Sequence, residues 1–253
     1  MLLLLAVVIA LSGCSSATGV GHPSSSARSG PAVGLTVFAA ASLTGVFDDI
    51  SHAFMTEHPG VTVHAVYDGS STLVTQLVEG APADVFATAD EATMQRAVKA
   101  GLIDGAPSLF ATNTLEIAVA PGNPAGIRGL ADLAKPGLAV VVCAVQVPCG
   151  AASADLLTRA GVELTPASEE QNVKAVVTKV SLGEADAGLV YATDVQASEG
   201  RIEGVDIGAD VHNRYLIGKL KAAGSPEAAS AFVGFVLSDA GRQLLSDAGF
   251  RVR

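Results

Sequence analysis

Basic residues are scarce in this sequence of 253 residues. It has 15 Lys and Arg against 25 Asp and Glu, and its formal net charge at pH 7 is −10. This acidic balance argues against nucleic acid as a partner and against electrostatic attachment to an anionic membrane. An anionic ligand would therefore have to be held by local hydrogen-bond donors, against the field of the whole chain.

Long hydrophobic runs are also missing after the N-terminal segment. Residues 1–11 are apolar but too few to cross a bilayer as a permanent helix, and they end in Leu11-Ser12-Gly13-Cys14. This ending resembles the lipobox of bacterial lipoproteins, which implies a signal peptide at 1–13, cleavage before Cys14 and lipid on Cys14. No Lys or Arg precedes the run, which departs from that pattern. The alternative is an uncleaved apolar tail with a chance cysteine.

Cysteine is scarce as well, since the chain has only Cys143 and Cys149 besides Cys14. An exported protein folds in an oxidising setting, so a disulfide between Cys143 and Cys149 is a prediction, and two free buried thiols are the alternative. The histidines show no ligand spacing with these cysteines. We therefore expect no direct metal ligands.

The remainder of the chain has the composition of a globular protein, with 49% hydrophobic residues. Its length allows one large domain or two lobes of about 100 residues each. Residues 14–33, which are rich in Gly, Ser and Pro, predict a flexible tether behind the lipidated cysteine.

Apolar residues alternate between strand and helix periodicity along the chain. The expected strands are 35–38, 61–67, 81–88, 115–120, 138–142 and 187–191. The expected helices are 46–54, 73–80, 91–101 capped by Asp90, a segment after Gly150, 173–181, and two helices within 226–248, the second capped by Asp239. Strands that alternate with helices of about ten residues predict βαβ units and a parallel sheet with helices on its faces.

Two of the expected strand-to-helix turns place a serine at a helix N-terminus. Ser42 follows the small residues of Leu35-Thr36-Val37-Phe38-Ala39-Ala40-Ala41, and Ser70 follows Asp68-Gly69. The first amide N–H groups of a helix lack partners within it, and with the helix dipole they favour an anion. A serine there adds a hydroxyl donor. The alternative is that each serine is only an N-cap.

Six short motifs then point to a family. They are FAAASL at 38–43, GSSTL at 69–73, GAPADVFATAD at 80–90, VPCG at 147–150, AGLVYATD at 187–194 and AGF at 248–250. In this order and spacing, from about residue 34 to 250, the sequence resembles the substrate-binding proteins of molybdate ABC importers. The resemblance implies a two-lobed α/β periplasmic-binding fold of type II, each lobe a doubly wound sheet flanked by helices. Residues 34–112 plus 222–253 would form lobe 1 and residues 113–221 lobe 2, with the ligand in the cleft.

The resemblance also implies a set of residues that bind a tetrahedral oxyanion. They are the hydroxyl and amide of Ser42 and of Ser70, the backbone N–H of Cys149 and of Val173, and the phenol of Tyr191. Cys149 stands where alanine is more usual, and Asp68 stands where small or apolar residues are common. Without the family, Tyr191 would be interpreted as a core aromatic with its hydroxyl at the surface.

The residue types agree with this assignment for a chemical reason. Molybdate and tungstate are fully deprotonated at neutral pH, so their oxygens only accept hydrogen bonds, and a matching site needs only donors. The predicted function is extracytoplasmic, high-affinity binding of molybdate and tungstate by a monomer without a cofactor, and delivery to the permease and ATPase of an ABC importer. Contact with the membrane would be through the lipid anchor only.

Three alternatives stay open from the sequence. One is a binding protein for sulfate or phosphate, where Asp68 would accept the proton of phosphate. Another is an exported hydrolase with Cys149 or Ser42 as nucleophile, although no histidine lies in the turns concerned. The third is a purely structural lipoprotein.

Overall fold

The computed structural model describes residues 33–208 and 212–252. The predicted signal peptide, the lipidation of Cys14 and nearly all of the tether lie outside the described residues and stay predictions. Within this part of the chain, none of the helices combines the length and the apolar character that a membrane span requires.

The strands are hydrogen-bonded in the order β2-β1-β3-β9-β4-β7-β5-β6, and β8 pairs with β4. Their bounds are β1 Val33–Ala40, β2 Val61–Asp68, β3 Val85–Thr88, β4 Ser108–Val119, β5 Val140–Cys143, β6 Ser168–Glu170, β7 Ala187–Tyr191, β8 Glu203–Val205 and β9 His212–Lys219. Strand β1 pairs in parallel with β2 and β3, and β5 with β6 and β7, as the alternating pattern predicts. The pairs of β9 with β3 and β4, and of β4 with β7 and β8, are antiparallel. The expectation of a parallel sheet therefore holds only for part of the strands, because β9, which is distant in sequence from β3 and β4, returns between them.

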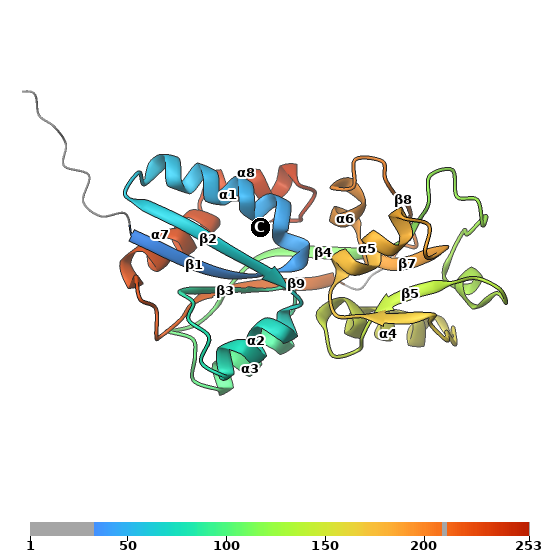
Figure 1. Cartoon of the computed structure of the whole chain (residues 1–253), viewed down its shortest axis with the longest axis horizontal. Coiled ribbons are helices and arrows are strands. Elements are labelled where there is room, and N and C mark those ends of the chain that lie inside the picture. The colour runs from blue at the N-terminus through green and yellow to red at the C-terminus, as the bar shows by residue number, and fades with distance from the viewer. Residues whose placement is uncertain (1–32, 209–211, 253) are drawn as a thin grey trace, which may run out of the picture. The chain divides into compact units, whose positions relative to one another are not determined.

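Helices cover both faces of this sheet at each end of it (Figure 1). Helices α1, α7 and α8 lie on one face of β1, β3 and β9, and α2 and α3 lie on the other; α5 and α6 lie opposite α4 across β7 and β5. Their bounds are α1 Thr44–Glu57, α2 Ser70–Val78, α3 Glu91–Lys99, α4 Pro148–Ala160, α5 Val173–Ser181, α6 Ala192–Gln196, α7 Pro226–Leu237 and α8 Asp239–Asp247, with 3₁₀ turns η1 Ala41–Leu43 and η2 Leu130–Ala134. The predicted α/β fold with flanking helices is confirmed.

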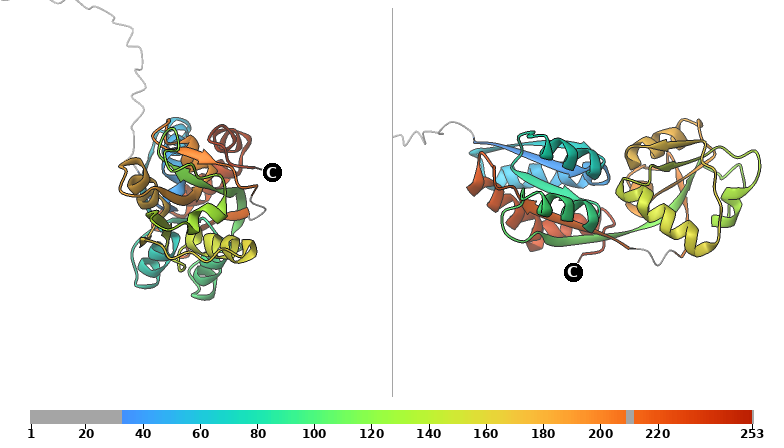
Figure 2. Two further views of the ribbon diagram at one scale, coloured as in Figure 1. Left: turned by 90° about the vertical axis from the view of Figure 1, so that its right-hand side faces the viewer. Right: turned by 90° about the horizontal axis from the view of Figure 1, so that it is seen from below.

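Separate hydrophobic cores divide the described chain into two lobes. The first lobe packs around Phe47, Phe54 and Phe232 on one face of its strands and around Phe86 on the other. The second lobe packs around Ile117 and the strands β5 and β7. The long strand β4 passes from one lobe to the other, with β9 beside it (Figure 2). The predicted lobe boundaries stay predictions, and β9 packs with the first lobe through Tyr215, Leu216 and Ile217.

Among the element boundaries that differ from the expectation, three have local reasons. Strand β3 begins at Val85 rather than at residue 81, and Pro82, which lacks an N–H, lies in the part that is not strand. Helix α4 begins at Pro148 because proline is favoured at the first helical position. The cap of α8 is Ser238 and not Asp239, since Ser238 has extended backbone and its side chain accepts from the Gly241 N–H at 3.3 Å. The predicted cap Asp90 is confirmed, accepting from the Thr93 N–H at 3.0 Å.

Candidate functional site

A small pocket lies where the two lobes meet, and all five residues predicted to bind an oxyanion line it. The lining residues are small, apolar or hydroxyl-bearing: Ala40, Ala41, Ser42, Gly69, Ser70, Ala89, Val147, Pro148, Cys149, Asn172, Val173 and Tyr191. Its cavity volume is about 10 Å³, far below the range of about 300–1,000 Å³ typical for drug-sized ligands. The pocket therefore suits a small ion. None of these lining residues carries a charged side chain.

Ser42 reaches the pocket from η1, the short turn between β1 and α1. Neither η1 nor α1 has a side-chain hydrogen bond at its N-cap, so the interpretation of Ser42 as only an N-cap is wrong. Its Oγ lies 2.9 Å from the Oη of Tyr215 on β9, and Ser42 is buried. The serine is thus held by a phenol from a distant strand rather than by its own helix.

Ser70 is the first residue of α2, and its hydroxyl also has a partner outside that helix. The N-cap position is Gly69, which has no side chain to cap with, so an N-cap role for Ser70 is wrong as well. The backbone N–H of Ala89 donates to Ser70 Oγ at 3.1 Å. A Cβ on Gly69 would lie 2.2 Å from the carbonyl oxygen of Gln171. Glycine is therefore required where the two lobes approach backbone to backbone.

The second lobe contributes two helix N-termini to the pocket. Cys149 is in the first turn of α4, after the N-cap Val147, and Val173 is the first residue of α5, after the N-cap Asn172. Amide groups in these positions have no partner inside their helix, and the positive ends of both helix dipoles meet here. The second lobe thus supplies main-chain donors, as the resemblance implies for Cys149 and Val173.

The predicted disulfide between Cys143 and Cys149 is present, with the two Cα atoms 5.7 Å apart. It ties the end of β5 to the first turn of α4, whose N-terminus borders the pocket. The same turn is packed against the end of β5 and the residue after it, since a Cβ on Gly150 would lie 2.6 Å from the carbonyl oxygen of Cys143 and 1.9 Å from that of Ala144. The bridge and the glycine together hold the turn that presents Cys149 to the pocket.

Tyr191 ends β7 and is fully buried. Its Oη accepts a hydrogen bond from Asn213 Nδ2 at 3.0 Å, so the interpretation of Tyr191 as a core aromatic with a surface hydroxyl is wrong. Burial, and after it the neighbouring Tyr215 phenol, raise the pKa of Tyr191 well above its usual value. The phenol is therefore protonated at neutral pH and is able to donate.

Asp68 does not line the pocket. Its Oδ1 accepts from the Gly69 N–H at 2.7 Å and from Asn172 Nδ2 at 2.9 Å. Asn172 caps α5 at the same time, because its Oδ1 accepts from the Ala175 N–H at 3.0 Å. Asp68 therefore links the first lobe to a helix of the second lobe, and its carboxylate is engaged outside the pocket.

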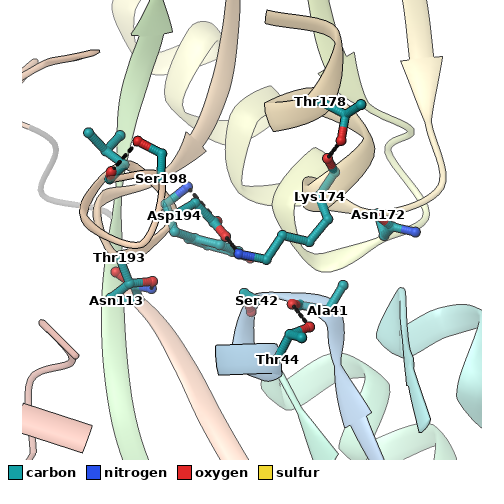
Figure 3. Close-up of polar contacts among 12 residues, drawn as sticks. Ala41, Ser42, Thr44, Asn113, Asn172, Lys174, Thr178, Thr193, Asp194 and Ser198 are labelled. Atoms are coloured by element: carbon teal, nitrogen blue, oxygen red, sulfur yellow. Dashed lines mark hydrogen bonds and ion pairs between the residues drawn. The ribbon is translucent and has the colours of Figure 1, made fainter. Parts of the chain in front are cut away.

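An ion pair stands beside the pocket without entering it. Lys174 reaches from α5 to Asp194 at the start of α6, with Nζ 2.9 Å from Oδ1 (Figure 3). The Asp194 side chain is fully buried, and its Oδ2 also accepts from the Tyr191 N–H at 3.3 Å. Burial raises the pKa of Asp194, and Lys174 acts in the opposite direction. The lysine charge is thus paired with a carboxylate.

Comparison with known proteins gives the chain a family. The model of the family of bacterial extracellular solute-binding proteins matches residues 35–251. The chain belongs to this family. A curated relative, the molybdate-binding protein ModA of Mycobacterium tuberculosis, is 45% identical over 250 residues, which cover 98% of this chain and 94% of the relative.

Solved structures of solute-binding proteins share the fold. The periplasmic molybdate-binding protein of Azotobacter vinelandii has a TM-score of 0.72 at 20% identity, over 87% of this chain and 99% of that one. The sulfate-binding protein SubI of Mycobacterium tuberculosis has a TM-score of 0.75 at 20% identity, over 87% of both chains. The fold is therefore shared by proteins that bind different oxyanions, and the choice of ligand has to be argued from the site.

The site of this solute-binding protein does not match the hydrolase alternative. Cys149 has its sulfur in the disulfide, so it has no thiol to act as nucleophile. Ser42 has a phenol as its partner instead of a base, and no histidine is among the residues that line the pocket. His52 and His64 are exposed on α1 and β2.

Several residues that hold the site were missed in the sequence. Tyr215 and Asn213 lie two positions apart on β9, hence on the same face of the strand, and both contact hydroxyls of the pocket. Asn172 and the Ala89 amide were missed too. The spacing of Asn213 and Tyr215, two positions apart, was the available signal in the sequence. It identifies them as residues that support the site only when the neighbours of β9 are known.

Proposed function

We propose that this solute-binding protein captures molybdate (and tungstate) outside the cytoplasm and delivers it to an ABC importer. The observation that carries the proposal is a pocket that offers hydroxyl and main-chain donors and is lined by no charged side chain. The 45% identity to a protein named molybdate-binding protein supports the same ligand. The partners would be the permease and the ATPase of the importer, and the protein would act as a monomer.

The donor set favours molybdate over other tetrahedral anions for two reasons. Sulfate is also fully deprotonated at neutral pH, but it is smaller, and its oxygens would not reach donors spaced for the longer Mo–O bonds. Phosphate keeps a proton and needs an acceptor, and the carboxylate of Asp68 that could accept it is bonded to Gly69 and Asn172. Both rivals therefore leave hydrogen bonds unmade, which costs affinity.

A thermal-shift panel tests this function on protein that lacks residues 1–14. A ligand that binds only the folded state stabilises it by about 2.7 kcal/mol when present at about 100 times its Kd. Molybdate and tungstate are expected to raise the melting temperature in the micromolar range, and sulfate and phosphate only at much higher concentration. No shift with molybdate, or an equal shift with sulfate or phosphate, would overturn the proposal.

The anchor is a second part of the proposal. The motif Leu11-Ser12-Gly13-Cys14 supports lipid on Cys14, which would keep the exported protein at the outer face of the cell membrane. Intact-mass analysis of protein purified from membranes is expected to give a chain that begins at Cys14 with acyl groups. Cys14→Ser is expected to release the protein from the membrane, and an unmodified native N-terminus would exclude the anchor.

Reduction of the disulfide gives a further test of the site. The bridge closes a short loop, so its loss is expected to lower stability by only about 2 kcal/mol. It also frees the turn that presents the Cys149 amide, so molybdate affinity is expected to fall more noticeably than the melting temperature. The Cys143→Ser, Cys149→Ser double variant should behave like the reduced protein. Two titratable thiols in the native, unreduced protein would refute this idea.

A further inference from the structure

Each of the three hydroxyl groups at the pocket already has a hydrogen-bond partner within the protein. Ser42 Oγ lies 2.9 Å from Tyr215 Oη, Ser70 Oγ lies 3.1 Å from the Ala89 nitrogen, and Tyr191 Oη lies 3.0 Å from Asn213 Nδ2. A hydroxyl has one proton to donate and lone pairs that accept. What it offers to a ligand therefore depends on what its other partner does.

For two of the hydroxyls the direction of the hydrogen bond is fixed by chemistry. The Ala89 N–H is only a donor, so Ser70 Oγ accepts from it. Asn213 Nδ2 lies 3.0 Å from the carbonyl oxygen of Ala89 as well as 3.0 Å from Tyr191 Oη. A flipped amide would place Asn213 Oδ1 against that carbonyl, acceptor against acceptor, so the Nδ2 group faces both. Tyr191 Oη therefore accepts, and its own proton stays free to donate.

The third pair is decided by burial. Tyr215 is fully buried, so its hydroxyl has to donate to a partner. Ser42 Oγ at 2.9 Å is in position to accept. Donation from Tyr215 to Ser42 leaves the proton of Ser42 for the pocket.

We propose that Tyr215 and Asn213 are positioning residues that orient the hydroxyls of Ser42 and Tyr191 so that each donates its proton to the ligand. The inference rests on the proposed function and assigns its selectivity against protonated anions to β9. A free hydroxyl could turn and accept the proton of hydrogen phosphate. A hydroxyl that already accepts from Tyr215 or Asn213 presents its own proton to that ligand instead. An anion without protons accepts a hydrogen bond from every donor. In a protonated anion, the O–H group faces a donor of the protein and finds no acceptor.

Tyr215→Phe tests this role because it removes one hydroxyl and keeps the ring. Calorimetry would measure molybdate affinity, and competition against bound molybdate would measure phosphate and sulfate. Losing one hydrogen bond behind Ser42 is expected to weaken molybdate by about 2- to 10-fold. The phosphate-to-molybdate affinity ratio is expected to rise about tenfold or more, because Ser42 becomes free to accept. The sulfate-to-molybdate ratio should stay unchanged, since neither anion carries a proton.

A control separates positioning from packing. Phe250 packs edge to face on the Tyr215 ring, with the ring centroids 5.3 Å apart, so Phe250→Leu disturbs the ring and keeps its hydroxyl. Phe250→Leu should lower the melting temperature without changing the phosphate-to-molybdate or the sulfate-to-molybdate affinity ratio. The inference is overturned if Tyr215→Phe weakens all three anions equally, if phosphate gains nothing in competition, or if Phe250→Leu changes the phosphate ratio to the same extent. Failure of the wild type to bind molybdate would instead contradict the proposed function.

Discussion

Replacing Lys174 by methionine is expected to lower the free energy of unfolding by about 3 kcal/mol at neutral pH. Lys174 pairs at 2.9 Å with Asp194, whose side chain is fully buried. Removal of one partner of such a pair leaves an uncompensated buried charge, which typically costs about 3–5 kcal/mol. The lower end of this range of stability loss applies here, because the Lys174 side chain is 35% exposed and solvent already screens the pair.

The stability that Lys174→Met loses should depend on pH in a defined direction. Burial raises the pKa of Asp194 and Lys174 lowers it, so loss of the lysine raises the folded-state pKa further. A raised pKa means that the folded state binds the proton more tightly than the unfolded state. The stabilisation from that proton is present below the unfolded-state pKa and is lost as the pH rises through the folded-state pKa. The difference between wild type and variant is therefore smallest in acid and grows toward neutral pH.

Urea unfolding between pH 4 and pH 8 measures both effects. Lys135→Met is the matched control, because Lys135 pairs with Asp132 at the surface and its side chain is 57% exposed. The control should change stability by less than about 0.5 kcal/mol. The double variant Lys174→Met, Asp194→Leu should recover much of the loss, since no buried charge remains. A pH-independent loss, or one no larger than that of the control, would contradict this account of the pair.

Ser42→Ala and Ser70→Ala are each expected to weaken molybdate about 10- to 100-fold. Each variant removes a hydroxyl that would donate to a charged ligand, and such a bond is worth about 1.5–3 kcal/mol. The Ala89 N–H also loses its acceptor in Ser70→Ala, which is expected to lower the free energy of unfolding by about 1–3 kcal/mol.

Ser51→Ala is the matched control for both serine variants. Ser51 is a buried serine of α1 whose hydroxyl has no hydrogen-bond partner among the described residues, and it does not line the pocket. Its replacement should leave molybdate affinity unchanged. Titration calorimetry of the three variants compares them directly. Wild-type affinity in Ser70→Ala or Ser42→Ala would show that the serine hydroxyls do not hold the ligand.

The residues at strand-to-helix turns could be predicted from the sequence because their signal is local. Small residues after an apolar strand, followed by serine and a helical pattern, identify the turns of Ser42 and Ser70 without any knowledge of the fold. The short separation of Cys143 and Cys149 likewise allowed the disulfide to be predicted. That the five predicted residues meet in one pocket is a finding of the structure.

The residues behind the pocket could not be predicted, because their partners are distant in sequence. Tyr215 contacts Ser42 across 173 positions, and Asn213 contacts Tyr191 only because β9 lies between β3 and β4. The direction of the Asp68 carboxylate depends on Asn172, which is 104 positions away. Local periodicity carries no information on such pairs, and the antiparallel placement of β9 was missed for the same reason.

Titration calorimetry of the wild-type protein with molybdate, tungstate, sulfate and phosphate tests the central claim most directly. That claim is a site of donors alone, assembled from both lobes and spaced for a large, fully deprotonated tetrahedral anion. The account predicts that molybdate and tungstate bind with similar high affinity at one site per chain, and that sulfate and phosphate bind at least about 100-fold more weakly, the equivalent of about 2.7 kcal/mol. Binding of sulfate or phosphate as tight as that of molybdate would contradict it.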